Sequence, residues 1–252
     1  MITNATVKLV TSLADAKGRR RSGMFVAEGS KCVIDTIGRF ELQHLYATQA
    51  WLDSHPLDPL SASVAEAVGR ADLGRMTTLM LAPDVIAVYR LPEPAVFDPT
   101  ALHGQLVVAL DRVQDPGNLG TIMRTADWMG IDTILASSDT VDCFNPKAIQ
   151  ATMGAVSRVR VIYGDLPAML GKIDMPVYGT FLDGDNIYTS QLTPAGVVVM
   201  GNEGRGVSPE VAACVSRRLL IPSYPPGRPT SESLNVATAT AMVLAQFRSK
   251  LF

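Results

Sequence analysis

Short apolar runs alternate with segments of helical periodicity through most of the chain. The clearest runs lie at 106–110, 197–200 and 219–221. Because an uninterrupted apolar run is typical of a strand covered on both faces, these runs predict a parallel sheet. We expect strands at about 105–110, 131–136, 158–162, 176–182, 196–200 and 218–221, and helices at about 119–129, 146–152, 166–171, 208–215 and 233–249. This order predicts an α/β fold with crossover helices.

A proline-rich stretch interrupts the alternation before the first of these strands. It runs from Leu91 to Pro99 and also contains Pro92 and Pro94. Proline removes a backbone donor and disfavours helix before its ring, so we place a linker here. Ahead of it we expect strands at 23–29, 42–47 and 85–89 and helices at 30–37 and 62–68. The sequence thus predicts a small α/β domain at 1–95 and a larger domain at 101–252.

The last predicted helix has one apolar face. Its apolar residues follow each other at spacings of three, four and three: Leu234, Ala237, Ala241 and Leu244. Such spacing turns one stripe of the helix toward a core. Ser231 or Ser233 can cap its amino end.

Composition and the N-terminal sequence narrow the class of protein. The 252 residues are 47% apolar and 6% aromatic, which is ordinary for a globular chain. No apolar stretch approaches the roughly 20 residues that span a bilayer, and the first six residues lack a signal-peptide pattern. We therefore expect a soluble, cytoplasmic protein without membrane attachment.

Cysteine and histidine do not cluster along the chain. There are three of each, widely separated: Cys32, Cys143, Cys214, His44, His55 and His103. An odd number of distant cysteines offers neither a disulfide framework nor a CxxC metal clamp. We expect reduced thiols and no metal site.

The first 31 residues are basic although the whole chain carries a formal net charge of −2. Lys17, Arg19, Arg20 and Arg21 lie within five residues of each other. Such a cluster can bind RNA phosphates. It can equally be the solvated end of a helix, and charge alone does not separate the two interpretations.

Three polar loops follow predicted strands and carry most of the candidate chemistry. They are Asn118-Leu119-Gly120, which leads to Arg124, then Gly201–Gly206, and then Ser233-Leu234-Asn235. Ligands of parallel α/β folds bind at the carboxyl ends of the strands. Glycine allows close approach of backbone to a ligand, while Asn, Glu and Arg supply acceptors, donors and charge.

Familiar nucleotide-binding motifs do not account for these loops. The glycines at 201–206 lack the GxGxxG spacing of dinucleotide-binding proteins, and no P-loop is present. Each polar residue also has a structural interpretation: Asn118 as a helix cap, Glu203 as a turn cap and Lys147 as a surface residue beside a helix start. A phosphate contact by Lys147 stays open. Arg124 stands among apolar and small residues, so it either pairs within the fold or faces an anion.

Taken together, the loops resemble the motifs of the SpoU (TrmH-like) family of SPOUT RNA ribose 2′-O-methyltransferases. The first reads DPGNLGTIMRTAD at 115–127 and the second VMGNEGRGVS at 199–208. The third begins with Ile221-Pro222 and ends with SLNVA at 233–237. The resemblance covers about residues 101–252. Residues 19–29 are similar to the start of the substrate-recognition domain that often precedes this catalytic domain.

The resemblance implies S-adenosylmethionine as the cofactor and a deep trefoil knot in the last part of the chain. In the family, backbone around the second and third motifs holds the cofactor. The corresponding residues here are Gly201, Ile221, Leu234, Leu182 and Ser233. The segment 223–232 is longer and richer in proline than the common form, so it departs from the family pattern.

The resemblance also implies the catalytic residues and the assembly. Arg124, Asn118, Glu203 and Asn235 match the family's polar positions. Arg124 is then either the base or a cation that stabilises the developing alkoxide or clamps a phosphate. A homodimer would place Arg124 of one chain beside the cofactor of the other. Structured RNA, with rRNA ahead of tRNA, is the expected substrate.

Two other functions compete with this interpretation. A non-catalytic RNA-binding protein of the same fold would bind RNA and not the cofactor, and the polar residues in all three loops argue against it. A small-molecule or protein methyltransferase would keep its activity after RNase treatment, and the basic cluster argues against it.

Overall fold

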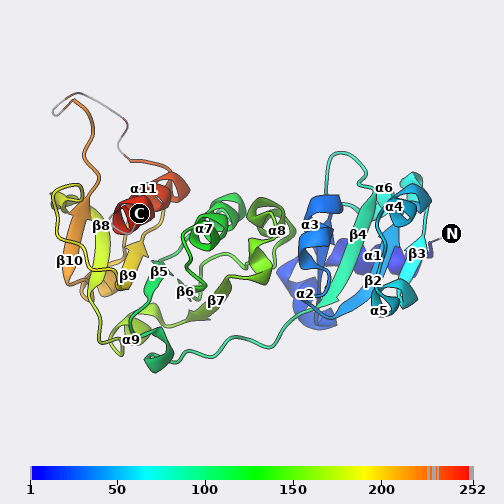
Figure 1. Ribbon diagram of the computed structural model, residues 1–252, viewed down its shortest axis with the longest axis horizontal. Coiled ribbons are helices and arrows are strands. Elements are labelled where there is room, and N and C mark those ends of the chain that lie inside the picture. The colour runs from blue at the N-terminus through cyan, green and yellow to red at the C-terminus, as the bar shows by residue number, and fades with distance from the viewer. Residues whose placement is uncertain (1, 226–227, 229–230, 232, 250–252) are drawn as a thin grey trace. The chain divides into compact units, whose positions relative to one another are not determined.

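The computed structural model describes residues 2–225, 228, 231 and 233–249. Contacts group the chain into two compact units, whose elements are labelled in Figure 1. The first consists of Met1–Glu93 and Asp142–Ser157, and the second of Pro94–Val141 and Arg158–Phe252. The division after Glu93 falls inside the proline-rich stretch. The domains expected at 1–95 and 101–252 are each continuous in sequence. In the structure, Asp142–Ser157 groups with the first unit instead.

The first unit is built on a four-stranded mixed sheet of order β1-β4-β2-β3. Strand β4 is antiparallel to both β1 and β2, whereas β2 and β3 are parallel. The elements are α1 (Asn4–Ser12), α2 (Ala16–Ser22), β1 (Met24–Glu28), α3 (Ser30–Thr36), β2 (Leu42–Ala47), α4 (Gln49–Ser54), α5 (Pro59–Ser63), β3 (Ala65–Ala67), α6 (Arg70–Met76), β4 (Val85–Arg90), α8 (Pro146–Thr152) and η2 (Ala155–Ser157).

Side chains alternate along these strands between two cores. Phe25 and Ala27 of β1 pack with α3, α4 and Ile149 of α8. Val26, which lies between them in sequence, packs with α1 and α6 in the other core. Because successive strand residues face opposite sides, helices cover both faces of this small sheet.

The helix predicted at 62–68 is wrong. The structure instead has the short helix α5, which ends at Ser63, followed by strand β3. Asp58 caps α5 by accepting from the backbone N–H groups of Leu60 and Ser61. The chain then pairs with β2 in the register Leu45↔Ala65, and this tertiary pairing outweighs the helical preference of the alanines.

The second unit contains a six-stranded sheet of order β10-β8-β9-β5-β6-β7. Every neighbouring pair in it is parallel, which confirms the parallel sheet predicted from the apolar runs. The elements are η1 (Thr100–Leu102), β5 (Leu106–Leu110), α7 (Pro116–Trp128), β6 (Thr133–Ser137), β7 (Arg160–Gly164), α9 (Leu166–Leu170), β8 (Val177–Asn186), β9 (Gly196–Met200), α10 (Pro209–Ala212), β10 (Arg217–Leu220) and α11 (Val236–Arg248).

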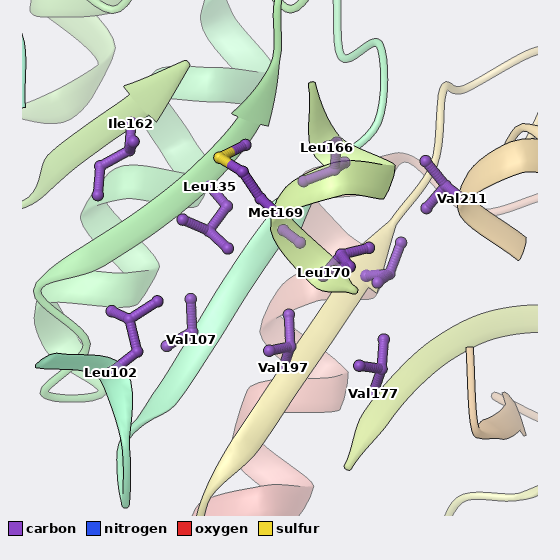
Figure 2. Packing of buried hydrophobic residues seen from close by; sticks show 12 residues of the cluster. Leu102, Val107, Leu135, Ile162, Leu166, Met169, Leu170, Val177, Val197 and Val211 are labelled. Atoms are coloured by element: carbon purple, nitrogen blue, oxygen red, sulfur yellow. The ribbon is translucent and has the colours of Figure 1, made fainter. Parts of the chain in front are cut away.

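Apolar side chains cover both faces of this sheet. Figure 2 shows one face, where Val107, Val177 and Val197 pack beneath Leu166 and Leu170 of α9. Helices α7 and α11 lie together on the other face (Figure 1), and Tyr178 of β8 contacts Phe247 of α11 there. Burial on both faces explains why the strands are apolar without interruption.

The cap of the last helix differs from the prediction. Asn235, and neither Ser231 nor Ser233, is the N-cap of α11. Its side-chain oxygen accepts from the backbone N–H groups of Ala237 and Thr238 at 3.0 and 3.2 Å. Asparagine is as good a cap as serine, so composition did not separate the candidates. Over the described residues, no helix is long and apolar enough to cross a membrane.

Candidate active site

The sheet order brings the three polar loops to one edge. Strand β5 ends opposite β9 in the register Leu110↔Met200, and the N–H of Asp111 donates to the Met200 carbonyl at 2.9 Å. Strand β8 lies between β9 and β10. Since the strands are parallel, the loops after β5, β9 and β10 leave from the same edge of the sheet.

A chain of hydrogen bonds joins these loops through their side chains. Asn118, in the first turn of α7, donates from Nδ2 to Oε1 of Glu203 at 2.7 Å. Asn235 donates from Nδ2 to Oδ1 of Asn118 at 2.9 Å. Asn235 also caps α11, so its amide has one defined orientation. The structure therefore brings Asn118, Glu203 and Asn235 together, one from each motif.

The cap role suggested for Asn118 belongs to another residue. Asp115 is the N-cap of α7, and its carboxylate accepts from the backbone N–H of Asn118 at 2.7 Å. The side chain of Asn118 is thus left for Glu203 and Asn235. Because both Nδ2 and Oδ1 of Asn118 are engaged, the amide has one fixed orientation. Its second N–H and the second lone pair of its oxygen can then meet a further partner.

The second loop is closed on itself around Asn202. Asn202 and Gly206 exchange two backbone hydrogen bonds of 3.0 and 2.9 Å. The Asn202 side-chain oxygen accepts from the N–H groups of Gly204 and Arg205, both at 3.0 Å. A Cβ on Gly201 would lie 2.3 Å from the carbonyl carbon of Gly206. Closure of the loop therefore requires glycine at position 201. From the sequence, we had explained this glycine by close approach of the backbone to the cofactor.

Two residues that the sequence analysis missed hold the ends of this loop. Asp111 is 2% exposed and accepts from the backbone N–H of Ser208 at 2.5 Å. The carbonyl of Arg112 accepts from Nδ2 of Asn202 at 2.8 Å. The signal in the sequence was two charged residues directly after the buried run Leu106–Leu110. Charged residues at the end of a buried strand rarely stay buried without a partner.

Arg124 lies apart from the hydrogen-bonded residues. It is exposed on α7, and no hydrogen bond or ion pair joins its side chain to another described residue. Six positions separate it from Asn118, which turns the two side chains to different sides of the helix. Thr121 and Trp128 share the exposed side of Arg124, and Trp128 is 86% exposed. Within one chain, Asn118 therefore does not orient Arg124.

The residues implied for the cofactor lie in β8 or after β9 and β10, and several offer apolar surface. Leu182, in the outer part of β8, is 80% exposed, and Leu234 is 46% exposed. Ile221 directly follows β10 and is half-buried, while Ser233 is exposed. Strands β8 and β10 shift register between Arg218 and Leu219, and Leu182 lies in the segment of β8 left out of the pairing.

The basic cluster is split by burial, and the assignment of Arg19 to RNA is wrong. Arg19 is 2% exposed and forms an ion pair with Asp142 at 2.6 Å. It also donates to the carbonyls of Leu13 and Ala14 at 2.9 and 3.0 Å. A guanidinium committed in this way has no room for a phosphate. Arg19 instead ties α2 to the segment that contains α8.

The other candidate phosphate-binding residues are exposed. Lys17, Arg20 and Arg21 lie on α2, and Lys147 lies at the start of α8. Both helices belong to the first unit and both contact β1. Asn145 caps α8 by accepting from the N–H of Lys147, as the sequence suggested for a capped helix start.

The cysteines take no part in the hydrogen-bonded chain that joins the three loops. Cys32 and Cys143 are buried, and Cys214 is half-buried. Burial, followed by the charges of Asp35 and Glu28, raises the pKa of Cys32 to about 12, so its thiol stays protonated. Across the described ranges, no group of three or more His, Cys, Asp and Glu side chains could hold a metal ion.

Family comparison agrees with the geometry of the site. The model of the SpoU rRNA Methylase family matches residues 105–245, which is more than half of the chain. The chain belongs to the SpoU family. The matched segment contains the Glu203–Asn118–Asn235 chain and all six strands of the second sheet. A second model, the MRM3-like substrate binding domain, matches residues 4–77 of the first unit.

Several individual proteins are similar to this SpoU chain. The 23S rRNA guanosine 2′-O-methyltransferase RlmP of Bacillus subtilis is 33% identical over 65% of the chain and 64% of its own length. The structure of a putative TrmH-family RNA methyltransferase from Porphyromonas gingivalis is 36% identical, covers 99% of both chains and has a TM-score of 0.86. An AdoMet-bound rRNA methyltransferase from Sinorhizobium meliloti is 28% identical over 100% of this chain and 97% of its own, with a TM-score of 0.83.

Proposed function

We propose that this SpoU-family chain transfers a methyl group from S-adenosylmethionine to a ribose 2′-hydroxyl of ribosomal RNA. The observation that carries the proposal is the Glu203–Asn118–Asn235 chain, because it locks one polar residue from each motif at the ligand-binding edge of the sheet. The names of RlmP and of the Sinorhizobium meliloti protein support both the reaction and the substrate. A cytoplasmic location remains a prediction of the sequence.

The residues around the second and third loops fit S-adenosylmethionine. Exposed Leu182 and Leu234 and half-buried Ile221 provide apolar contacts of the kind that hold an adenine ring or an aliphatic chain. The closed loop at Gly201–Gly206 fixes the backbone that follows β9, the strand next to β8. When bound, this cofactor supplies a methyl group activated by a positively charged sulfur. The trefoil knot implied by the family resemblance stays a prediction.

The side chains at this edge divide the remaining work. Asn118 is held by two partners and orients the ribose, while Glu203 and Asn235 keep it in place. The 2′-hydroxyl must lose its proton as it reacts, and in this proposal the proton passes to solvent water. A guanidinium is effectively always protonated, so we assign Arg124 to stabilising the developing alkoxide or holding the adjacent phosphate, and not to proton abstraction.

The first unit supplies the substrate-binding surface in this proposal. Lys17, Arg20, Arg21 and Lys147 are exposed cations of that unit. The match to the MRM3-like substrate binding domain supports the same role. Recognition by exposed cations depends on phosphate charge and not on base sequence, so these residues position the RNA and do not choose the nucleotide.

Salt dependence of RNA binding tests this surface. Changing Lys17, Arg20, Arg21 and Lys147 together to Gln should lower the slope of log Kd against log salt by about two to four, because each lost phosphate contact releases about one counterion fewer. The matched control removes four other exposed cations: Arg39, Arg70, Arg90 and Lys172. Its slope should stay near that of the wild type. Equal slopes in the two variants, measured by fluorescence anisotropy, would reject the surface.

A homodimer completes the proposed site. Arg124 lies outside the hydrogen-bonded chain of its own protomer and shares an exposed helix side with Trp128. Aromatic residues such as tryptophan are enriched at protein interfaces relative to the rest of the surface. We assign this side of α7 to a two-fold contact that brings Arg124 of one protomer to the cofactor of its partner.

Disrupting this contact should separate the protomers and remove activity together. Trp128→Glu should yield a monomer by light scattering and reduce methyl transfer at least about tenfold. The control is Tyr188→Glu, because Tyr188 is also an exposed aromatic residue of the second unit. This variant should leave the dimer intact. Mixed dimers of Arg124→Ala chains with chains unable to bind cofactor should recover one working site. A wild-type monomer at working concentration contradicts the proposal.

The reaction itself is tested with purified protein. We expect calorimetric binding of S-adenosylmethionine and transfer of its labelled methyl group to unmodified rRNA transcripts, with the label lost after RNase digestion. RNA binding without cofactor binding would instead identify a non-catalytic RNA-binding protein. Label that survives RNase would identify a protein or small-molecule methyltransferase.

A further inference from the structure

Arg112 has a backbone conformation that an arginine seldom adopts. Its φ is +60°, and within the described part of the chain only Met153 is another non-glycine residue with positive φ. A Cβ makes this left-handed region unfavourable. The backbone N–H donates to Oγ of Ser137 at 2.9 Å, and the carbonyl accepts from Asn202. Glycine would make both bonds without the strain, so the backbone does not explain why the residue is arginine.

The side chain of Arg112 is only partly satisfied. Its Nε is buried and makes no hydrogen bond, and among the described residues no other buried side-chain nitrogen or oxygen lacks a partner. Oδ1 of Asp111 lies 3.4 Å from this nitrogen and compensates its charge, while Oδ2 is taken by Ser208. The side chain is 26% exposed. Arginine has five N–H donors, so its outer nitrogens can reach a ligand.

The position of Arg112 points to the RNA side of the site. It follows β5 and touches Ser137 of β6 on one side and Asn202 of the second loop on the other. The residues assigned to the cofactor lie in β8 or after β9 and β10, and these strands are on the opposite side of β5 from β6. Through the second loop, Arg112 is linked to Glu203 and Asn118.

We infer that Arg112 binds a phosphate group of the RNA beside the ribose that is methylated. The inference rests on the proposed function. The planar guanidinium fork matches two phosphate oxygens, and phosphates flank every ribose in RNA. A strained, non-glycine residue at a loop of the site agrees with selection for the side chain, since backbone strain clusters at functional sites.

Removing Arg112 alone would leave the buried negative charge of Asp111 without its partner, so the test is made in a background that lacks this charge. Asp111→Asn serves as the background, and Arg112→Gly is added to it. Against this background, the double variant should bind unmodified rRNA transcripts about tenfold more weakly at about 0.15 M salt, and its salt slope should fall by about one. Its affinity for S-adenosylmethionine should stay within about twofold and its Tm should not fall, because glycine relieves the strain.

Two further variants complete the experiment. Arg112→Lys in the otherwise wild-type chain should keep the salt slope and still weaken RNA binding, since it keeps the charge and loses the fork. Arg218→Gln removes an exposed arginine that is already paired with Asp183, and it should change neither quantity. Unchanged RNA affinity and slope on losing Arg112 reject the inference. Weaker cofactor binding with an unchanged slope also rejects it. Failure of the wild type to bind or methylate RNA rejects the proposed function instead.

Discussion

Arg124→Ala should lower kcat for methyl transfer by at least about 100-fold, which is the usual cost of removing one preorganised group that stabilises charge in a transition state. Affinity for S-adenosylmethionine should stay within about twofold, because Arg124 is assigned to the ribose or its phosphate and not to the methyl donor. Stability should not change, since no hydrogen bond or ion pair to another described residue is lost. Single-turnover kinetics and calorimetry measure the first two effects.

Arg124→Lys separates charge from geometry in the same assay. Lysine keeps the positive charge and loses the planar fork, so we expect partial activity if Arg124 stabilises an alkoxide and very little if it clamps a phosphate with two hydrogen bonds. Thr121→Ala, a change on the same exposed side of α7, is the control and should keep wild-type turnover. Near wild-type kcat in Arg124→Ala on the natural RNA would show that the reacting groups have been wrongly assigned.

Gly201→Ala should weaken binding of S-adenosylmethionine by at least tenfold, or roughly 1.4 kcal/mol or more. The added Cβ would lie 2.3 Å from the carbonyl carbon of Gly206 and 2.4 Å from the nitrogen of Val207, so the closed loop must open. Gly204→Ala is a matched control in the same loop. Its Cβ would meet only Oδ1 of Asn202, at 3.8 Å.

Comparison of the two glycine variants separates loop closure from a general effect of bulk. Gly204→Ala should change cofactor affinity by less than about twofold, because 3.8 Å is an ordinary van der Waals contact. The same Tm in both variants would confirm that the loss in Gly201→Ala is local. If calorimetry gives equal affinities for Gly201→Ala and Gly204→Ala, the role of the closed loop in cofactor binding is contradicted.

The sequence was most informative where burial acts on both faces of a strand. The runs that become β5 and β9 are apolar throughout because helices cover both sides of the sheet, and their ends place the polar loops at one edge. Asn118, Glu203 and Asn235 could therefore be proposed as neighbours from their positions after predicted strands. The order in which they bond could not be predicted, because it depends on side-chain geometry between residues as far as 117 positions apart in sequence, as Asn118 and Asn235 are.

The first unit was harder to predict because its elements are short and held by distant contacts. Helices α1, α2, α4 and α6 were not predicted, and tertiary packing stabilises helices of this length more than their own propensity does. The function of a charged residue is equally hard to predict from its sequence neighbours, as Arg19 shows. Nothing near it in sequence marks it as buried, since its partner Asp142 lies 123 positions away and belongs to the segment that joins the first unit.

The most direct test of the proposed function is a map of ribose 2′-O-methylation in the rRNA of cells with and without this gene. One 2′-O-methyl group should be absent from the rRNA of the deletion strain, return when the wild-type gene is restored, and stay absent when the Arg124→Ala gene is restored to an equal protein level. An unchanged methylation map in the deletion strain, with wild-type protein produced in the parent, would contradict the assignment of this chain as an rRNA 2′-O-methyltransferase.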